Sequence, residues 1–138
     1  MFIAVRVLIV LLGLMFLFVG ASFLFDPVGM GGNFGLEAKG AHGLASIRAD
    51  LTGFFWVAGG CALIGVWKQR GELLLVTAAF MGIAVSARAL SLALDGTFDG
   101  FLPPMVVEAV TLILCVIGAR MMSGARALPG EHSEPKPV

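Results

Sequence analysis

Charged residues, cysteine and histidine are all scarce in this chain of 138 residues. Only 13% of the residues are charged, and the nine basic residues balance the nine acidic ones without forming a basic patch. That balance excludes nucleic-acid binding, which needs a concentrated positive surface. Cys61 and Cys115 have neither CxxC spacing nor histidines at metal-site spacing. We therefore expect two buried apolar thiols and no metal site.

The two histidines also restrict cofactor chemistry. His42 lies in an expected loop and His132 lies in the C-terminal tail. Haem held by two histidines within helices is therefore excluded, and no cofactor is predicted. The sequence also has no nucleophile–base motif of any kind. These absences argue against an enzyme.

Hydrophobic residues, by contrast, are abundant: they make up 59% of the chain, and its mean hydropathy is +1.00. A soluble domain of this size cannot hide so much apolar surface from water. Four apolar runs each approach the length of about 20 residues that spans a bilayer core. The sequence predicts an all-α, four-transmembrane-helix antiparallel bundle in one membrane domain, residues 1–122, with spans at about 2–25, 44–67, 73–94 and 104–122.

Several local signals set these boundaries. Pro27 ends the first span, and the glycine-rich segment 28–43 is predicted to be a long loop. Trp67, followed by two cations, is typical of a membrane interface. Residues 20–22 resemble a signal-peptide cleavage site, but the length of the first run favours a retained span. The proline-rich segment 123–138 is predicted to be a disordered cytoplasmic tail.

Lysine and arginine positions predict the orientation. The outer loops carry Lys39 alone, together with several acidic residues. The opposite side carries most of the basic residues, namely Arg6, Lys68, Arg70, Arg120, Arg126 and Lys136. We expect a multi-pass protein of the bacterial inner membrane with both termini in the cytoplasm.

Four charged residues lie inside the predicted spans: Arg48, Asp50, Arg88 and Glu108. A charge at the centre of a span costs at least ~2.5–3.5 kcal/mol on insertion scales, so each of the four needs an explanation. The topology places all four in the outer third of the membrane. Arginine stays ionised, so Arg88 most needs a carboxylate, and Asp50 and Glu108 are the available partners. Arg48 points away from Asp50, toward headgroups or another subunit.

Helical spacing extends this charged cluster into a polar pocket. Ser91 and Thr111 share faces with Arg88 and Glu108, while Phe54 and Trp56 are candidates for its floor. Three interpretations remain open: an ion-pair clamp that fixes helix register, a binding site for a small solute or lipid headgroup, and proton-coupled transport or catalysis.

Small residues indicate where helices approach one another. Ala78, Gly82 and Ser86 recur at four-residue spacing on the third span. In a membrane such a stripe favours close packing of a neighbouring backbone.

The Arg48-Ala49-Asp50 motif, with Arg88 in the third span and Glu108 in the fourth, resembles an uncharacterised bacterial family. That family consists of small four-helix inner-membrane proteins known only as a domain of unknown function, and the layout is also distantly similar to DoxX-like proteins. The resemblance implies a four-helix fold over about residues 2–122. The DoxX likeness implies an association with quinone or sulfur redox chemistry, although this chain has no redox residues of its own.

Three functional hypotheses follow from these observations. The first is a non-enzymatic membrane protein that binds a small solute, a lipid headgroup or a partner at the buried charges. The second is an accessory subunit of a membrane oxidoreductase or transporter. The third is a proton-coupled small carrier that uses Glu108 or Asp50 and works as a dimer. The expected partners are the lipid bilayer and either another membrane protein or further copies of the chain.

Overall fold

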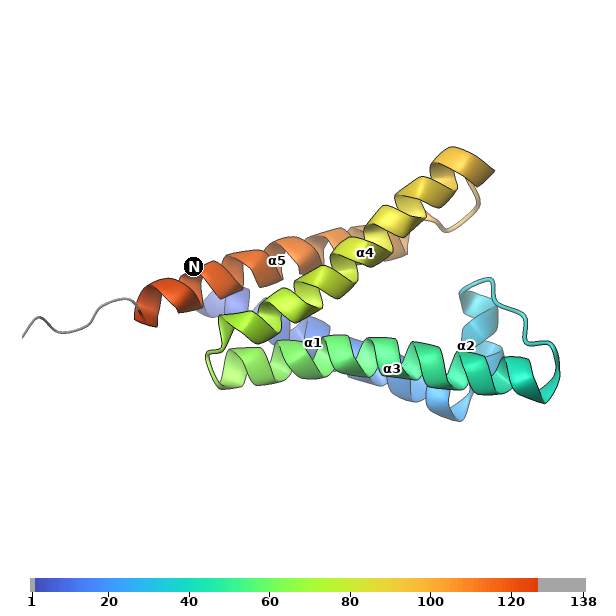
Figure 1. Cartoon of the computed structure of the whole chain (residues 1–138), viewed down its shortest axis with the longest axis horizontal. Helices are drawn as coiled ribbons and strands as arrows, with labels where there is room; N and C mark the ends of the chain where they lie inside the picture. Colours follow the sequence, from blue (N-terminus) through green and yellow to red (C-terminus); the bar gives the residue numbers. More distant parts are fainter. Residues whose placement is uncertain (1, 127–138) are drawn as a thin grey trace, which may run out of the picture.

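The computed structural model describes residues 2–126, which fold into helices without any strand. In chain order these are α1 (Phe2–Phe25), α2 (Pro27–Asn33), α3 (Gly40–Trp67), α4 (Gly71–Asp95) and α5 (Leu102–Arg126) (Figure 1). All except the short α2 are long and apolar enough to cross a membrane. The predicted all-α bundle with four spans is confirmed, and the chain is a multi-pass membrane protein.

The main correction concerns the segment expected to be a long loop. Its first part forms α2, because Pro27 suits a first helical turn and the Asp26 carboxylate accepts a hydrogen bond from Gly29 N at 2.9 Å. Two boundaries also move. Helix α3 begins at Gly40, before the expected start, and α5 continues to Arg126, into the segment predicted as a tail. The rest of that tail, 127–138, lies outside the described residues.

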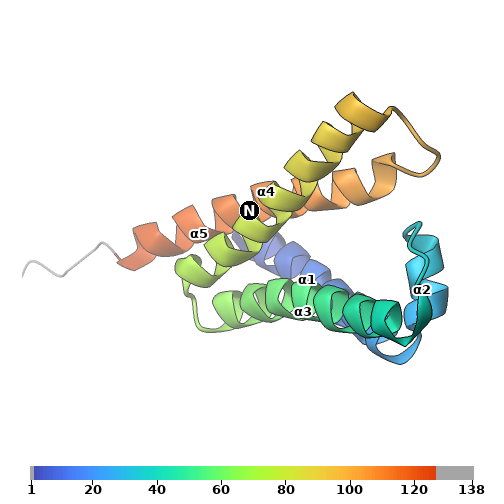
Figure 2. The same ribbon diagram turned by 45° about the vertical axis from the view of Figure 1, so that its right-hand side comes forward.

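The four long helices form two antiparallel pairs. Helix α1 packs along α3, and α4 packs along α5. Figures 1 and 2 show the two pairs meeting near the α3–α4 turn and diverging toward the opposite end, where α2 lies. The bundle is therefore closed at one end and open at the other.

The α1–α3 pair is held by glycine contacts and by hydrogen bonds to backbone carbonyls. A β-carbon added at Gly59 would stand 2.7 Å from the carbonyl oxygen of Gly13, so the two backbones touch there. Toward the open end, three α3 side chains donate to α1 carbonyls: Trp56 Nε1 to Leu17 at 3.2 Å, Thr52 Oγ1 to Gly20 at 3.1 Å and Arg48 Nε to Leu24 at 3.0 Å. These bonds hold α1 and α3 together in the half of the pair that is nearer the open end.

Among the described residues, the larger of two buried core clusters lies at the closed end. It consists mainly of small and aliphatic residues from all four long helices: Ile9, Ala62, Val66, Leu74, Ala78, Cys115, Ala119 and Met122. Gly71 allows α4 to approach α5 closely, since a β-carbon there would lie 2.8 Å from Ala119 O. Farther out, Thr77 Oγ1 donates to Ala58 O at 2.8 Å. Between that bond and the open end, no hydrogen bond joins the α1–α3 pair to the α4–α5 pair within residues 2–126.

Candidate functional site

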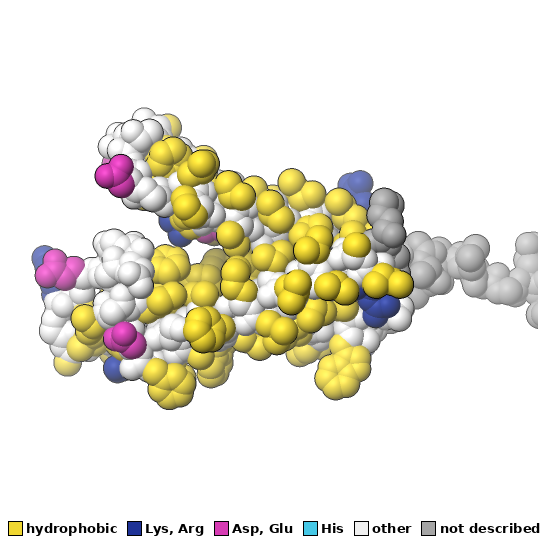
Figure 3. Space-filling view, turned by 180° about the vertical axis from the view of Figure 1, so that it is seen from behind, with side chains coloured by type: hydrophobic (Ala, Val, Ile, Leu, Met, Phe, Trp, Pro, Cys, Tyr) yellow, Lys and Arg dark blue, Asp and Glu magenta, His cyan; other side chains and the backbone are white. Residues whose placement is uncertain are grey.

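A cleft of about 750 Å³ opens where the two helix pairs diverge. Figure 3 shows the hollow between the two arms of the molecule, whose outer surface is largely hydrophobic. Its walls come from every helical element and from both loops at the open end. A cleft of this volume is in the range of small-molecule and lipid sites.

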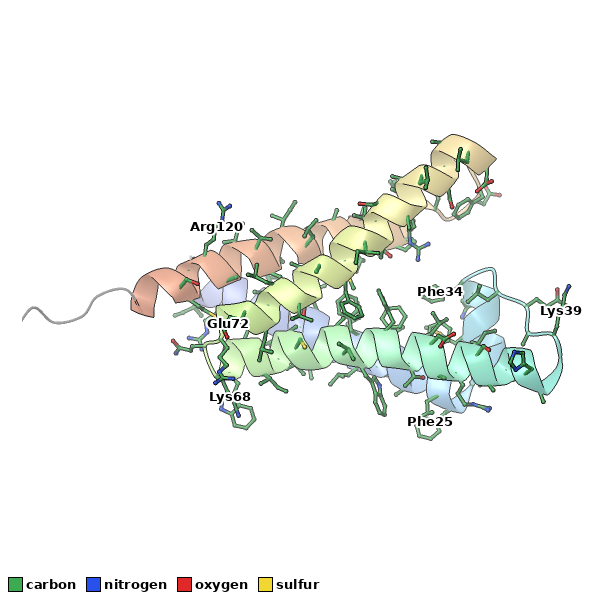
Figure 4. The ribbon with its side chains drawn as sticks, in the orientation of Figure 1. Phe25, Phe34, Lys39, Lys68, Glu72 and Arg120 are labelled. Carbon is green, nitrogen blue, oxygen red and sulfur yellow. The ribbon has the colours of Figure 1, made fainter. Side chains whose placement is uncertain are left out.

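One wall of the cleft is aromatic. Phe16, Phe54 and Phe55 line it from α1 and α3, and their rings contact one another, with centroids 5.1 Å apart for Phe54–Phe55 and 5.9 Å for Phe16–Phe55. Phe34, which follows α2 and is labelled in Figure 4, closes the outer part of this wall. Its ring lies edge-on to that of Phe23, with centroids 5.2 Å apart. This wall suits an apolar chain.

The opposite wall carries an ion pair. Arg88 Nε on α4 donates to Glu108 Oε1 on α5 at 2.8 Å, so the pair ties these two helices together. Glu108 is only 8% exposed, and its Oε2 is buried without a hydrogen-bond partner. The Arg88 side chain is 33% exposed and lines the cleft. Within residues 2–126, no hydrogen bond is made by either Nη of Arg88.

The other two intramembrane charges do not join this pair. Asp50 is exposed on α3, does not line the cleft, and forms no ion pair within the described part of the chain. Arg48 is also exposed, and it caps the end of α1 by donating to Leu24 O. The α3 residues that line the cleft are Leu51, Phe54 and Phe55, and neither Arg48 nor Asp50 is among them.

Of the four predicted lining residues, the structure places only Phe54 in the cleft. Trp56 is turned toward α1, to which its indole donates, and Thr111 is buried and donates to Val107 O of its own helix at 2.7 Å. Ser91 lies beside Arg88 in a separate recess of about 210 Å³. The cleft is therefore more apolar than the sequence suggested.

Sequence reasoning missed the rim of the cleft. Asn33 and Phe34 reach it from the end of α2, and Asp99 reaches it from the loop between α4 and α5. Only one signal in the sequence points to these residues, namely that both loops lie on the same side of a four-span bundle. That signal places the loops at one end without saying which side chains turn inward.

The cleft combines apolar and charged groups. In the part of the chain that the structure describes, no three side chains of His, Cys, Asp or Glu gather closely enough to hold a metal ion. The cleft offers an apolar surface for dispersion contacts, a guanidinium with unused donors, and a carboxylate at its rim.

Residues 4–119 match a family described as a domain of unknown function (DUF4345), and the chain belongs to that family. The match includes most or all of each of the four candidate membrane-spanning helices and both walls of the cleft. No curated protein and no solved structure matches the chain.

Proposed function

We propose that this protein binds a membrane lipid or lipid-like amphiphile in the cleft, without transforming it chemically. The observation that carries the proposal is the pairing of a phenylalanine wall with the Arg88–Glu108 ion pair inside one cleft at membrane depth. A molecule that is apolar along most of its length and polar at one end complements both features. A small polar solute would leave the aromatic wall uncovered.

The physical environment supports this occupant. Met81 and Ala84 line the cleft from within the span of α4, so the cleft reaches into the depth of the acyl chains. An apolar wall at that depth gives water no hydrogen-bonding partners, whereas an acyl chain gains dispersion contacts along it. The ion pair then gives the polar end of the molecule a fixed anchor near the membrane surface.

In this proposal the open end of the cleft faces the outer side of a bacterial inner membrane, and both termini lie in the cytoplasm. Support comes from the cations: Figure 4 labels Lys39 at the open end, whereas Lys68 and Arg120 lie at the closed end, where Arg70 is also found. In a variant lacking native cysteines, Lys39→Cys should react with an impermeant maleimide in intact cells. Lys68→Cys should react only after permeabilisation, and the reverse pattern would refute the orientation.

Blocking the cleft tests the binding function. Ala84 lines the cleft and Ala79 is exposed on the same helix without lining it, so Ala84→Trp and Ala79→Trp form a matched pair. Each protein is purified in mild detergent, and retained lipid is measured by mass spectrometry. We expect the native chain and Ala79→Trp to retain a stoichiometric lipid, and Ala84→Trp to lose most of it.

Two results contradict the proposed function. One is native protein that carries no retained lipid and takes none up when lipid is added back. The other is equal retention by Ala84→Trp and Ala79→Trp, which would place any bound lipid on the outer surface of the bundle. Thermal melting of both variants checks that each is folded before the comparison is made.

A further inference from the structure

The groups that line the cleft change in character with depth. On α4, Met81 lies about 10 Å deeper than Arg88, at ~1.5 Å of rise per residue. Asp99 lies beyond the end of α4, in the loop at the open end, and lines the same cleft. From the interior toward the surface, a bound molecule therefore meets an apolar wall, then a guanidinium, then a carboxylate.

The guanidinium is suited to a phosphate. Arg88 uses Nε for Glu108, which leaves both Nη groups without a hydrogen bond to any residue from 2 to 126. The planar fork of a guanidinium binds phosphate or carboxylate oxygens with two parallel hydrogen bonds. Since a third of the Arg88 side chain is exposed, these donors remain available to a ligand.

The charge balance argues against a simple anion. Glu108 already neutralises Arg88, so Asp99 gives the cleft one excess negative charge. A ligand with phosphate alone would add a second uncompensated charge near a low-dielectric wall. A ligand that also carries a cation on the surface side of its phosphate would neutralise the Asp99 carboxylate.

Resting on the proposed function, we propose that the lipid is zwitterionic, of the phosphoethanolamine class. Its phosphate binds the free Nη groups of Arg88 and its ammonium lies against Asp99. The order chain, phosphate, ammonium in such a lipid matches the order of the groups along the cleft. The cleft holds the head and the upper chains, and the remaining chain length lies in the bilayer.

The experiment compares two lipids on four forms of the full chain. Native protein and the variants Arg88→Gln, Asp99→Asn and Asp95→Asn are delipidated, mixed with equal amounts of phosphatidylethanolamine and phosphatidylglycerol, and analysed by native mass spectrometry. Asp95 is the matched control, because it is an exposed carboxylate at the end of α4 that does not line the cleft.

We expect native protein and Asp95→Asn to bind phosphatidylethanolamine in preference to phosphatidylglycerol. Asp99→Asn should lower that preference about two- to fivefold, the effect of one partly exposed charge pair. Arg88→Gln should weaken both lipids. If Arg88→Gln does not fold, Asp99→Asn still decides the outcome, since its side chain is exposed and pairs with no residue in 2–126.

The failure of this inference differs from the failure of the proposed function. Bound lipid without a preference for the ammonium headgroup, or equal effects of Asp99→Asn and Asp95→Asn, would overturn the zwitterionic assignment while lipid binding stands. No binding of either lipid would overturn both. Displacement of the lipid by equimolar glycerophosphoethanolamine would overturn the assignment to a lipid, because the water-soluble headgroup alone would then account for the affinity.

Discussion

The crossing of α1 and α3 gives the sharpest quantitative prediction. Gly59 faces α1, where an added β-carbon would lie 2.7 Å from Gly13 O and 3.2 Å from two carbons of Leu17. Gly60, its immediate neighbour on α3, has nothing within 4 Å of the same position. Gly59→Ala and Gly60→Ala therefore make the same chemical change, one at a backbone contact and the other in open space.

The magnitude follows from this difference. Both substitutions replace glycine within a helix and gain about 1 kcal/mol of intrinsic helix stability, which cancels in the comparison. Only Gly59→Ala forces a methyl group against a carbonyl oxygen that belongs to the backbone of α1 and cannot rotate away. Overpacking of this kind costs about 1–3 kcal/mol. We expect Gly59→Ala to be less stable than Gly60→Ala by that amount.

The assay is reversible unfolding in mixed micelles, with SDS titrated into a mild detergent and helix content followed by circular dichroism. The free energy of unfolding is compared between the two variants under one set of conditions. Equal stabilities would refute the close crossing of α1 and α3 at this point. A greater loss in Gly60→Ala would instead indicate that the face of α3 that carries Gly60 is the packed one.

Further substitutions test the ion pair within the α4–α5 pair and the hydrogen bond between the two helix pairs. Arg88→Met should destabilise the fold by roughly 2 kcal/mol, because it leaves the buried Glu108 carboxylate unpaired at a site that is still partly open to solvent. Adding Glu108→Leu should restore most of the lost stability in the same unfolding assay. If the double variant restores none of it, the pairing of Arg88 with Glu108 is contradicted. Thr77→Val removes the buried bond to Ala58 O and should cost about 0.6–1 kcal/mol, whereas Ser86→Ala, an exposed hydroxyl bonded within its own helix, should cost nearly nothing. Equal effects of these two hydroxyl deletions would count against Thr77 as a link between the pairs.

Much of the fold could be predicted from the sequence, because the length and composition of each apolar run identify it as a span. The end of α1 at Phe25 follows from the Asp26-Pro27 pair that comes next. Helix α2 was not predicted because its glycines are poor helix formers; the Asp26 cap and the burial of Pro27 and Gly31 stabilise it. Short helices of this kind depend on their surroundings.

The packing contacts were harder to predict. The small-residue stripe at Ala78, Gly82 and Ser86 indicated a close approach along α4, yet a β-carbon at Gly82 would meet only Leu112 side-chain atoms, at 3.8 Å or more. The backbones instead touch at Gly13 with Gly59 and at Gly71 with Ala119. Small residues permit close packing, but crossing angles decide which of them are used.

The sequence by itself determined the spans and the need of Arg88 for a carboxylate, because the cost of an unpaired charge in a membrane is a local property. Tertiary structure decided that Glu108 is the partner and that Asp50 is not, since this depends on the rotation of each helix about its own axis. It also decided that the helix pairs diverge and leave a cleft. Ala62, Ala78 and Ala119 are packed at the closed end, whereas phenylalanines line the cleft at the open end, and which side chains meet depends on how the helices pack.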